Sequence, residues 1–149
     1  MELIRRFPDL VVASALESWD FLDLADKSPL FTSPFGDVFM QGPKSYWLLD
    51  VVGGSLRELC ATGEELTAIL NTKDGRDEYL MVGLAAEAEA NGLVPSGDEI
   101  YEFRIPPVLG GSLAVANLQL IDFEVAVNLA GQIHEQVRNL PPGTPVRLG

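Results

Sequence analysis

The stretch RIPPVLGGSL, residues 104–113, constrains the fold of this chain more than any other segment. Pro106 and Pro107 fix φ and remove two backbone donors, so regular structure cannot run through them unchanged. Gly110 and Gly111 give access to left-handed backbone angles that other residues avoid. We therefore expect a turn of defined shape between two regular elements.

The turn lies within the longest run without a charged residue, 105–121, and that run contains too many prolines, glycines and amides for a membrane helix. The N-terminal MELIRRFPDL has no long apolar run with a cleavage site, which argues against a secretion signal. Cys60 is the only cysteine, so no internal disulfide can form, as is typical of a reducing compartment. We expect a soluble, cytoplasmic protein.

The length and composition favour one folded domain over residues 1–149. Apolar residues make up 47% of the 149 residues and charged residues 21%, which is an ordinary globular composition. In the final third, DEIYEFRI and NLQLIDF predict strands on either side of the turn. Asp122 can cap a last helix, 123–140, which Pro141 and Pro142 stop. The expected inward face of that helix consists of Ala126, Leu129 or Ala130, Ile133, Val137 and Leu140.

The first half predicts a helix and a small meander. Leu10, Ala13 and Leu16, with Phe21 or Leu24 as a further member, give a helix-like apolar stripe. KSPLFTSP is expected to break regular structure. FGDVFMQ and SYWLLDVV then read as a hairpin closed by GPK, and SLRELC as a third strand.

Two helices are expected in the middle of the chain. Thr62 and Glu65 form a capping signature for the first, and the second runs from Arg76 to Ala90 and ends at Asn91-Gly92. Strands and helices are thus interleaved without regular βαβ units. This pattern predicts an α+β fold, with a mainly antiparallel sheet packed against several helices and a long C-terminal helix.

The charge indicates which partners suit the surface. The chain has 22 acidic and 10 basic residues, a net charge of −12, so nucleic acid would be repelled and basic proteins attracted. Solubility alone is the simpler explanation. Residues 87–102 nevertheless carry acids and no base, either as a solvated face or as a docking surface for a basic partner: Glu87, Glu89, Asp98, Glu99 and Glu102.

Catalytic patterns are sparse. His134 is the sole histidine, which excludes a multi-histidine metal site, and we predict neither a metal nor another cofactor. A Cys60–His134 nucleophile pair is the one such arrangement the residues permit, although structural roles are favoured for both. A hydrolase built on two acids is a further alternative, and the glycines match no phosphate-binding loop.

Three motifs together resemble a known family. FGDVF, YWLLD followed by GG-SL, and the long final stretch from IYEFRIPPVLGGSL to LPPGTPV are similar to the C-terminal domain of bacterial type VI secretion system immunity proteins. That family protects against a DNase effector and is related in style to the Smi1/Knr4-like immunity group. The resemblance covers about residues 19–146 and is strongest in the final third.

The matching positions are mainly turn formers and small packing residues. The resemblance implies that Gly131 allows close helix approach, and that Gln132, His134 and Gln136 seat the turn at Pro107, Gly110 and Gly111. Relatives carry an additional N-terminal GAD-like domain, which we expect to be missing here. The matching residues are Gly36, Asp37, Phe39, Leu49, Asp50, Pro107, Leu109, Gly110, Gly111, Gly131, Gln132, His134, Gln136, Leu140, Pro141, Pro142 and Gly143.

The resemblance and the charge imply one leading function, which is a non-enzymatic immunity protein. It would occlude a basic protein toxin, such as a nuclease, with an acidic surface that imitates phosphate. An interaction module of the same fold without a toxin is the first alternative, and a small-molecule enzyme is the second.

Overall fold

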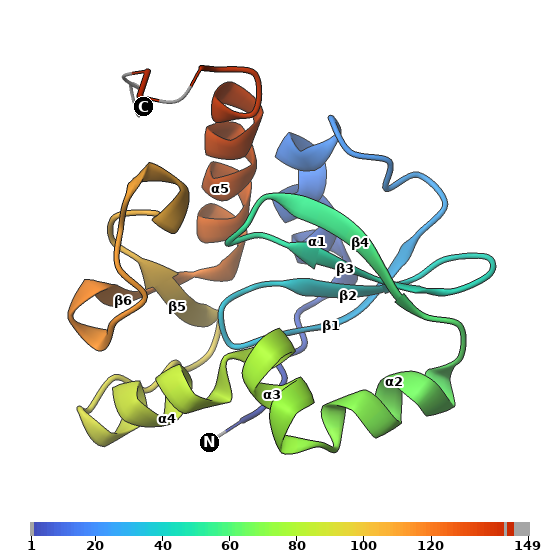
Figure 1. Cartoon of the computed structure of the whole chain (residues 1–149), viewed down its shortest axis with the longest axis horizontal. Coiled ribbons are helices and arrows are strands. Elements are labelled where there is room, and N and C mark those ends of the chain that lie inside the picture. Colours follow the sequence, from blue (N-terminus) through green and yellow to red (C-terminus); the bar gives the residue numbers. More distant parts are fainter. Residues whose placement is uncertain (1, 142, 145–149) are drawn as a thin grey trace.

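The computed structural model describes residues 2–141, 143 and 144. At its centre lies a four-stranded antiparallel sheet, whose strands follow one another in chain order (Figure 1): β1 (Ser28–Thr32), β2 (Val38–Gln41), β3 (Tyr46–Asp50) and β4 (Ser55–Cys60). The turn between β2 and β3 is closed by Gly42, whose N–H donates to the Ser45 carbonyl at 2.8 Å. The predicted hairpin and its third strand are confirmed.

Strand β1 corrects the prediction that KSPLFTSP breaks regular structure. The strand contains Pro29, which pairs with Met40, and the register shifts between Pro29 and Phe31. An edge strand tolerates proline because one side of its backbone needs no donor. Thr32, at the end of β1, also exchanges two backbone hydrogen bonds of 2.8 Å with Arg5. The N-terminal segment therefore covers part of this edge.

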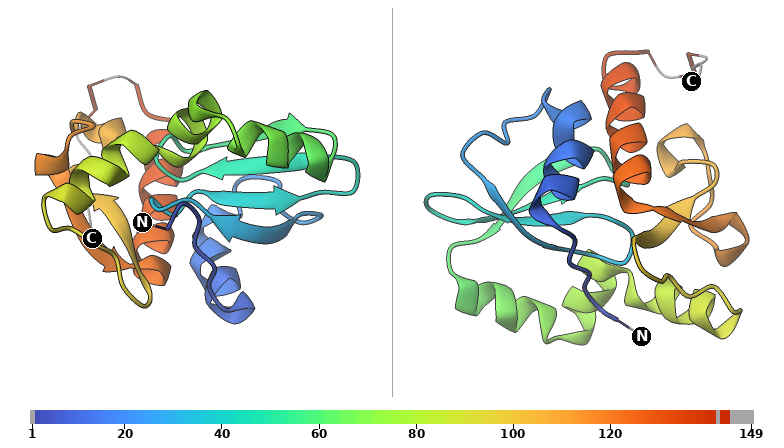
Figure 2. Two further views of the ribbon diagram at one scale, coloured as in Figure 1. Left: turned by 90° about the horizontal axis from the view of Figure 1, so that it is seen from below. Right: turned by 180° about the vertical axis from the view of Figure 1, so that it is seen from behind.

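Helices cover both faces of this sheet. Side chains of β2 alternate, so Val38 and Met40 pack toward α1 (Asp9–Ala15) and α5 (Phe123–Val137). Phe39, between them, packs toward α2 (Gly63–Leu70) and α3 (Lys73–Leu80). In the left view of Figure 2, α1 lies on one side of the sheet, and α2 and α3 lie on the other.

The predicted inward stripe of the first helix is wrong at Leu10 and Ala13, which are exposed, whereas Leu16 packs against the core as expected. Leu10 is 86% exposed, whereas Val12, Ala15 and Trp19 are buried. The 3₁₀ turn η1 (Leu16–Trp19) continues α1 and crosses α5 at Gly131, where a Cβ would collide with Ser18 Oγ and lie 2.9 Å from Trp19 Cδ1. The expected close approach at Gly131 thus occurs, and this tertiary contact decides which face of α1 is buried.

A separate two-stranded antiparallel sheet holds the expected turn. It consists of β5 (Glu99–Phe103) and β6 (Leu118–Asp122), and α5 follows directly. Asp122 caps α5 as predicted, since its Oδ2 accepts the Val125 N–H at 3.1 Å. The buried face of α5 includes Ala126 and Ile133 as expected, together with Phe123, Val127, Gly131 and His134. Leu140 is instead 39% exposed, and Pro142 lies outside the described residues.

The predicted helix from Arg76 to Ala90 is two helices. Helix α3 ends at Leu80, Met81 takes a left-handed φ of 50°, and α4 (Val82–Ala90) starts in a new direction. Leu80 packs with the large sheet, whereas Ala85 and Ala88 of α4 pack with β5 and β6. One straight helix cannot reach both clusters, so the chain bends between them.

The capping prediction at α2 holds. Thr62 Oγ1 accepts the Glu65 N–H at 3.1 Å, and Glu65 reaches back to the Ala61 N–H at 3.3 Å. The α+β class with antiparallel strands and a long C-terminal helix is confirmed. In the part of the chain that the structure describes, no helix is both long and apolar enough to cross a membrane.

Candidate functional site

The segment 105–113 forms a loop between β5 and β6, and the side chain of Asn117 holds this loop together. Asn117 Oδ1 accepts the Ile105 N–H at 3.0 Å. Its Nδ2 donates to the carbonyls of Ile105 and Ser112, each at 2.9 Å. One buried amide therefore fixes both ends of the loop.

The two glycines of the loop serve different needs. Gly110 has φ 96°, a left-handed angle that ends the 3₁₀ turn Pro107–Leu109. At Gly111 space is the constraint, because a Cβ there would collide with the Ile105 carbonyl oxygen and lie 2.6 Å from its carbon. Gly111 also donates its N–H to the Pro106 carbonyl at 3.1 Å. The loop therefore has one tightly packed shape.

This fixed loop presents apolar side chains to solvent. Ile105 is 57% exposed, Val108 42% and Leu113 63%. Loop residues 105–113 carry no charged group. Scattered exposed apolar residues are ordinary, whereas three on one short loop without charge suggest a contact surface.

A cavity of about 110 Å³, which we call the hairpin cavity, lies behind the loop between β5 and α5. Its walls are mainly apolar, and its polar wall residues are Glu102, Arg104 and His134. Pro106 and Pro107 contribute to its rim, so the loop and α5 meet here.

His134 lies against this cavity, and the backbone of Val51 and Gly54 packs beside its ring. Nε2 lies 3.1 Å from the Val51 carbonyl oxygen, an acceptor, so Nε2 carries the proton and donates. Nδ1 faces Gly54, where a Cβ would collide with it. Burial lowers the pKa of His134, which keeps the ring neutral. The histidine therefore packs against the backbone at Val51 and Gly54.

The structure brings His134, but not Gln132, to the loop. Gln132 is exposed and donates through Nε2 to Asn128 Oδ1 at 2.8 Å. His134 and Pro107 both line the hairpin cavity. At Gly110, by contrast, an added Cβ would have no neighbour within 4 Å.

The five predicted acidic residues are divided between two faces. Glu102 shares a strand face with buried Ile100, toward α5, and its Oε1 accepts from Gln119 Nε2 at 2.9 Å. Burial raises the pKa of this half-buried carboxyl. Glu89 lies on α4 near Tyr101, on the opposite face of β5, and its charge contributes to the raised pKa of the Tyr101 hydroxyl, behind burial. Glu87 on α4 is exposed.

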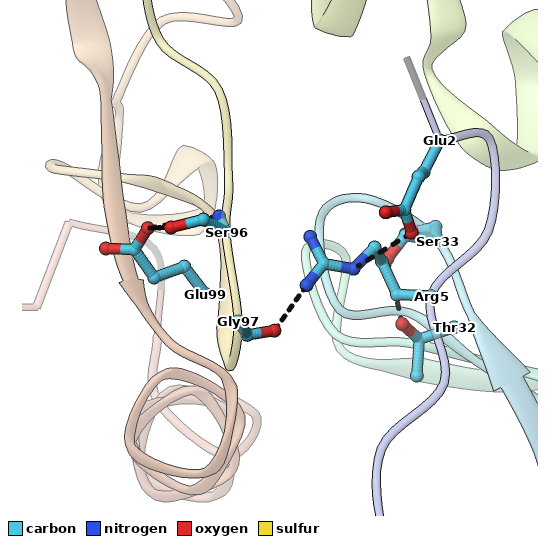
Figure 3. A network of polar contacts seen from close by, with 7 residues as sticks. All are labelled: Glu2, Arg5, Thr32, Ser33, Ser96, Gly97 and Glu99. Atoms are coloured by element: carbon cyan, nitrogen blue, oxygen red, sulfur yellow. Dashed lines mark hydrogen bonds and ion pairs between the residues drawn. The ribbon is translucent and has the colours of Figure 1, made fainter.

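Glu99 belongs to a polar network in which the N-terminal segment meets residues 96–99 (Figure 3). Glu99 Oε1 accepts from the N–H and the hydroxyl of Ser96, each at 3.2 Å. Arg5 Nη2 donates to the Gly97 carbonyl at 2.6 Å, and its Nε lies 3.7 Å from Glu2.

Asp98 keeps an exposed side chain while its carbonyl accepts the Phe123 N–H at 2.7 Å. Asp98 and Glu87 are therefore the more exposed members of the predicted acidic set.

A second hollow, of about 310 Å³, lies on the other side of the loop, and we call it the Asp50 groove. Asp37, Asp50, Arg57 and Glu78 contribute its charged groups. Val108 and Leu113 of the loop form one of its apolar walls. The groove could not be predicted from the sequence, because its acids come from the residue before β2, from β3 and from α3.

Asp37 is the most perturbed acid of the groove. Its Oδ1 accepts the Val51 N–H at 2.8 Å and its Oδ2 accepts from Ser33 Oγ at 2.9 Å, so it joins three segments of the sheet. Burial, and then the negative charge of Asp50, raise the pKa of Asp37 to about 7.

Replacing Asp37 with asparagine is expected to stabilise the protein at pH 8. A carboxyl whose pKa is higher in the folded state than in the unfolded state favours folding at low pH, and this contribution is lost as pH rises from about 4 to about 7. Asparagine keeps the same shape and a neutral acceptor for Val51, so the gain at pH 8 should be on the order of 1 kcal/mol. Urea unfolding of both proteins at pH 5.5 and pH 8 measures it. Equal pH dependence in the two proteins would contradict the raised pKa.

The described residues do not assemble the catalytic pair that the sequence permits. Cys60 ends β4, whereas His134 faces Gly54 at the start of β4, so the two lie about 20 Å apart along an extended strand. Burial raises the pKa of the Cys60 thiol, which disfavours the nucleophilic thiolate.

Among residues 2–141, 143 and 144, no three histidine, cysteine, aspartate or glutamate side chains are grouped as metal ligands. The geometry is suited to recognition, through an apolar loop between an apolar cavity and an acidic groove.

Comparison with solved structures gives a fold relative. The crystal structure of Atu4351 from Agrobacterium tumefaciens superimposes with a TM-score of 0.55 at 20% identity. The alignment covers 83% of this chain and 62% of that chain, so this chain spans less than two thirds of the length of Atu4351. At this identity the likeness concerns the fold alone. No curated protein matches the sequence.

Comparison with family models identifies the second half of the chain. The model of the C-terminal domain of the T6SS (type VI secretion system) immunity protein Tdi1 matches residues 61–134. The matched segment contains α2 to β6, the whole loop 105–113 and most of α5. The resemblance predicted from the sequence is thus confirmed over residues 61–134, which are similar to the C-terminal domain of the T6SS immunity protein Tdi1.

Proposed function

We propose that this chain is an immunity protein that acts in the cytoplasm, where it binds and neutralises a protein toxin delivered by a type VI secretion system. The family match over residues 61–134 is the observation that carries this proposal. We further propose that the toxin is a nuclease, which needs a basic surface to hold DNA phosphates. A protein with a net charge of −12 is attracted to such a surface and can cover it.

Occlusion requires a stable surface more than reactive groups, and the arrangement around the loop fits that requirement. His134 donates to the Val51 carbonyl and packs against Gly54, and Glu102 accepts a hydrogen bond from the Gln119 amide. Because these contacts hold both side chains in place, they favour a binding role for this region over a catalytic one. We therefore propose no catalytic step for this chain.

Growth of bacteria that produce the toxin encoded beside this chain's gene tests the proposal. Co-expression of this chain is expected to restore growth, whereas a catalytically inactive toxin should permit growth without it. Continued growth arrest, with both proteins present in the cells, would favour the alternative of an interaction module without a toxin.

The acidic residues 87–98 are expected to accelerate capture of the toxin. Reversing Glu87 and Asp98 together to lysine should lower the association rate constant roughly tenfold at low salt and weaken its salt dependence. Stopped-flow or surface-binding kinetics between 50 and 300 mM salt measure the change. The double variant Glu64→Lys, Asp74→Lys, at exposed acids of α2 and α3, changes the net charge equally. Equal slowing in both variants would show that net charge alone matters and would remove the local surface from the account.

A further inference from the structure

We propose that the loop 105–113 and the adjoining Asp50 groove form the surface that holds the partner once it has been captured. The occupant is a basic protein, which places an apolar side chain against Val108 and Leu113 and a lysine or arginine in the groove. This inference rests on the proposed function and adds to it the contact surface and the chemistry of the contact.

The apolar part of this surface is unusual for such a charged chain. Val108 and Leu113 are exposed, yet both also line the groove, so they border a hollow and do not project alone. Exposed apolar side chains at the rim of a hollow are typical of residues that dominate a protein interface.

The loop is also prepared for binding before a partner arrives. Three hydrogen bonds from the Asn117 side chain fix its ends, and Gly111 packs directly against the Ile105 carbonyl. Pro106 and Pro107 restrict the backbone further. Little conformational entropy is then lost on binding, so more of the contact energy appears as affinity.

The charges of the groove select a basic occupant. The groove is lined by Asp50, Glu78 and the buried Asp37, whose pKa of about 7 leaves it partly ionised at neutral pH. One base, Arg57, lies among them, with its guanidinium carbon 5.5 Å from the centre of the Tyr79 ring. The side-chain ion pairs found in the described part of the chain are Glu2–Arg5, Asp26–Lys27 and Lys73–Asp77, so none of them involves Asp50 or Glu78.

Repulsion within the groove supports the same choice. Asp37 and Asp50 lie close enough that the charge of Asp50 helps to raise the pKa of Asp37. A cation in the groove would relieve this repulsion, whereas an anion would increase it. The groove volume of about 310 Å³ is large enough for a long basic side chain.

The test compares two matched pairs of apolar-to-serine variants against the neighbouring-gene toxin in a catalytically inactive form. Val108→Ser with Leu113→Ser should raise the dissociation constant at least about tenfold, mainly through faster dissociation. Val125→Ser with Leu10→Ser, at residues 55% and 86% exposed on α5 and α1, should change it by less than about twofold. Glu78→Gln should also weaken binding and reduce its salt dependence. Calorimetry and surface-binding kinetics provide these values.

The outcomes separate this inference from the proposed function. If the unchanged protein binds the toxin and the loop pair binds equally well, the loop inference is overturned while the immunity function stands. If the unchanged protein does not bind the toxin, the proposed function fails, and this inference fails with it. If sedimentation shows that the protein alone dimerises and that Val108→Ser with Leu113→Ser abolishes the dimer, the surface belongs to a second copy and the inference is wrong.

Discussion

Replacing Trp19 with alanine is expected to lower the free energy of unfolding by about 3–5 kcal/mol. Trp19 is fully buried, with 0% of its surface exposed, and its ring packs 5.6 Å from His134 and 5.7 Å from Phe21, measured between ring centres. Its indole N–H donates to the Val127 carbonyl of α5 at 2.8 Å. The substitution removes a large core side chain and leaves that carbonyl without its donor.

Urea unfolding measures this loss, and the second tryptophan provides the control. Trp47 is half-buried, and the ammonium of Lys27 lies 4.5 Å from its ring centre. Trp47→Ala should therefore cost only about 1–2 kcal/mol. A similar loss for the two variants would contradict the placement of Trp19 as the contact between η1 and α5.

Replacing Gly111 with alanine is expected to displace the loop 105–113 and to lower toxin affinity more than tenfold. The new Cβ would collide with the Ile105 carbonyl oxygen, which is backbone and cannot turn away as a flexible side chain can. To relieve the collision, the loop must break the hydrogen bond from the Gly111 N–H to the Pro106 carbonyl, or the hydrogen bonds of the Asn117 side chain. This should lower the free energy of unfolding by about 1–3 kcal/mol. Hydrogen exchange of the loop amides and the dissociation constant measure the two effects.

Substitution of the neighbouring Gly110 provides the control, because it changes the backbone preference without changing the packing of the loop. Alanine at Gly110 meets no atom within 4 Å but must adopt φ 96°. It should cost about 1–2 kcal/mol of stability while the loop and the affinity remain. Equal loss of affinity in Gly110→Ala and Gly111→Ala would contradict the role of the fixed loop shape.

Local signals in the sequence predicted local structure well. The Thr62 and Asp122 caps, the hairpin around Gly42 and the close approach at Gly131 all depend on residues whose chemistry permits few alternatives. Tertiary contacts overrode weaker signals. Pro29 is accommodated because β1 is an edge strand, and Met81 bends the chain because α3 and α4 pack with different clusters.

The candidate site was only partly within reach of the sequence. The alternation of a strand places Glu99 and Glu102 on opposite faces, so their separation could have been predicted. Asn117 could also have been noticed as the polar residue before Leu118 in an uncharged run. The Asp50 groove could not be predicted, since Asp37, Asp50 and Glu78 meet the loop only through the packing of α3 beside the sheet.

We propose that this chain neutralises a nuclease toxin by covering its basic surface. The most direct test is titration of the neighbouring-gene toxin with the purified chain while DNA cleavage is measured. We expect cleavage to stop near one chain per toxin, and the loop pair Val108→Ser with Leu113→Ser to require a higher concentration. Undiminished cleavage in the presence of excess folded chain would contradict the claim.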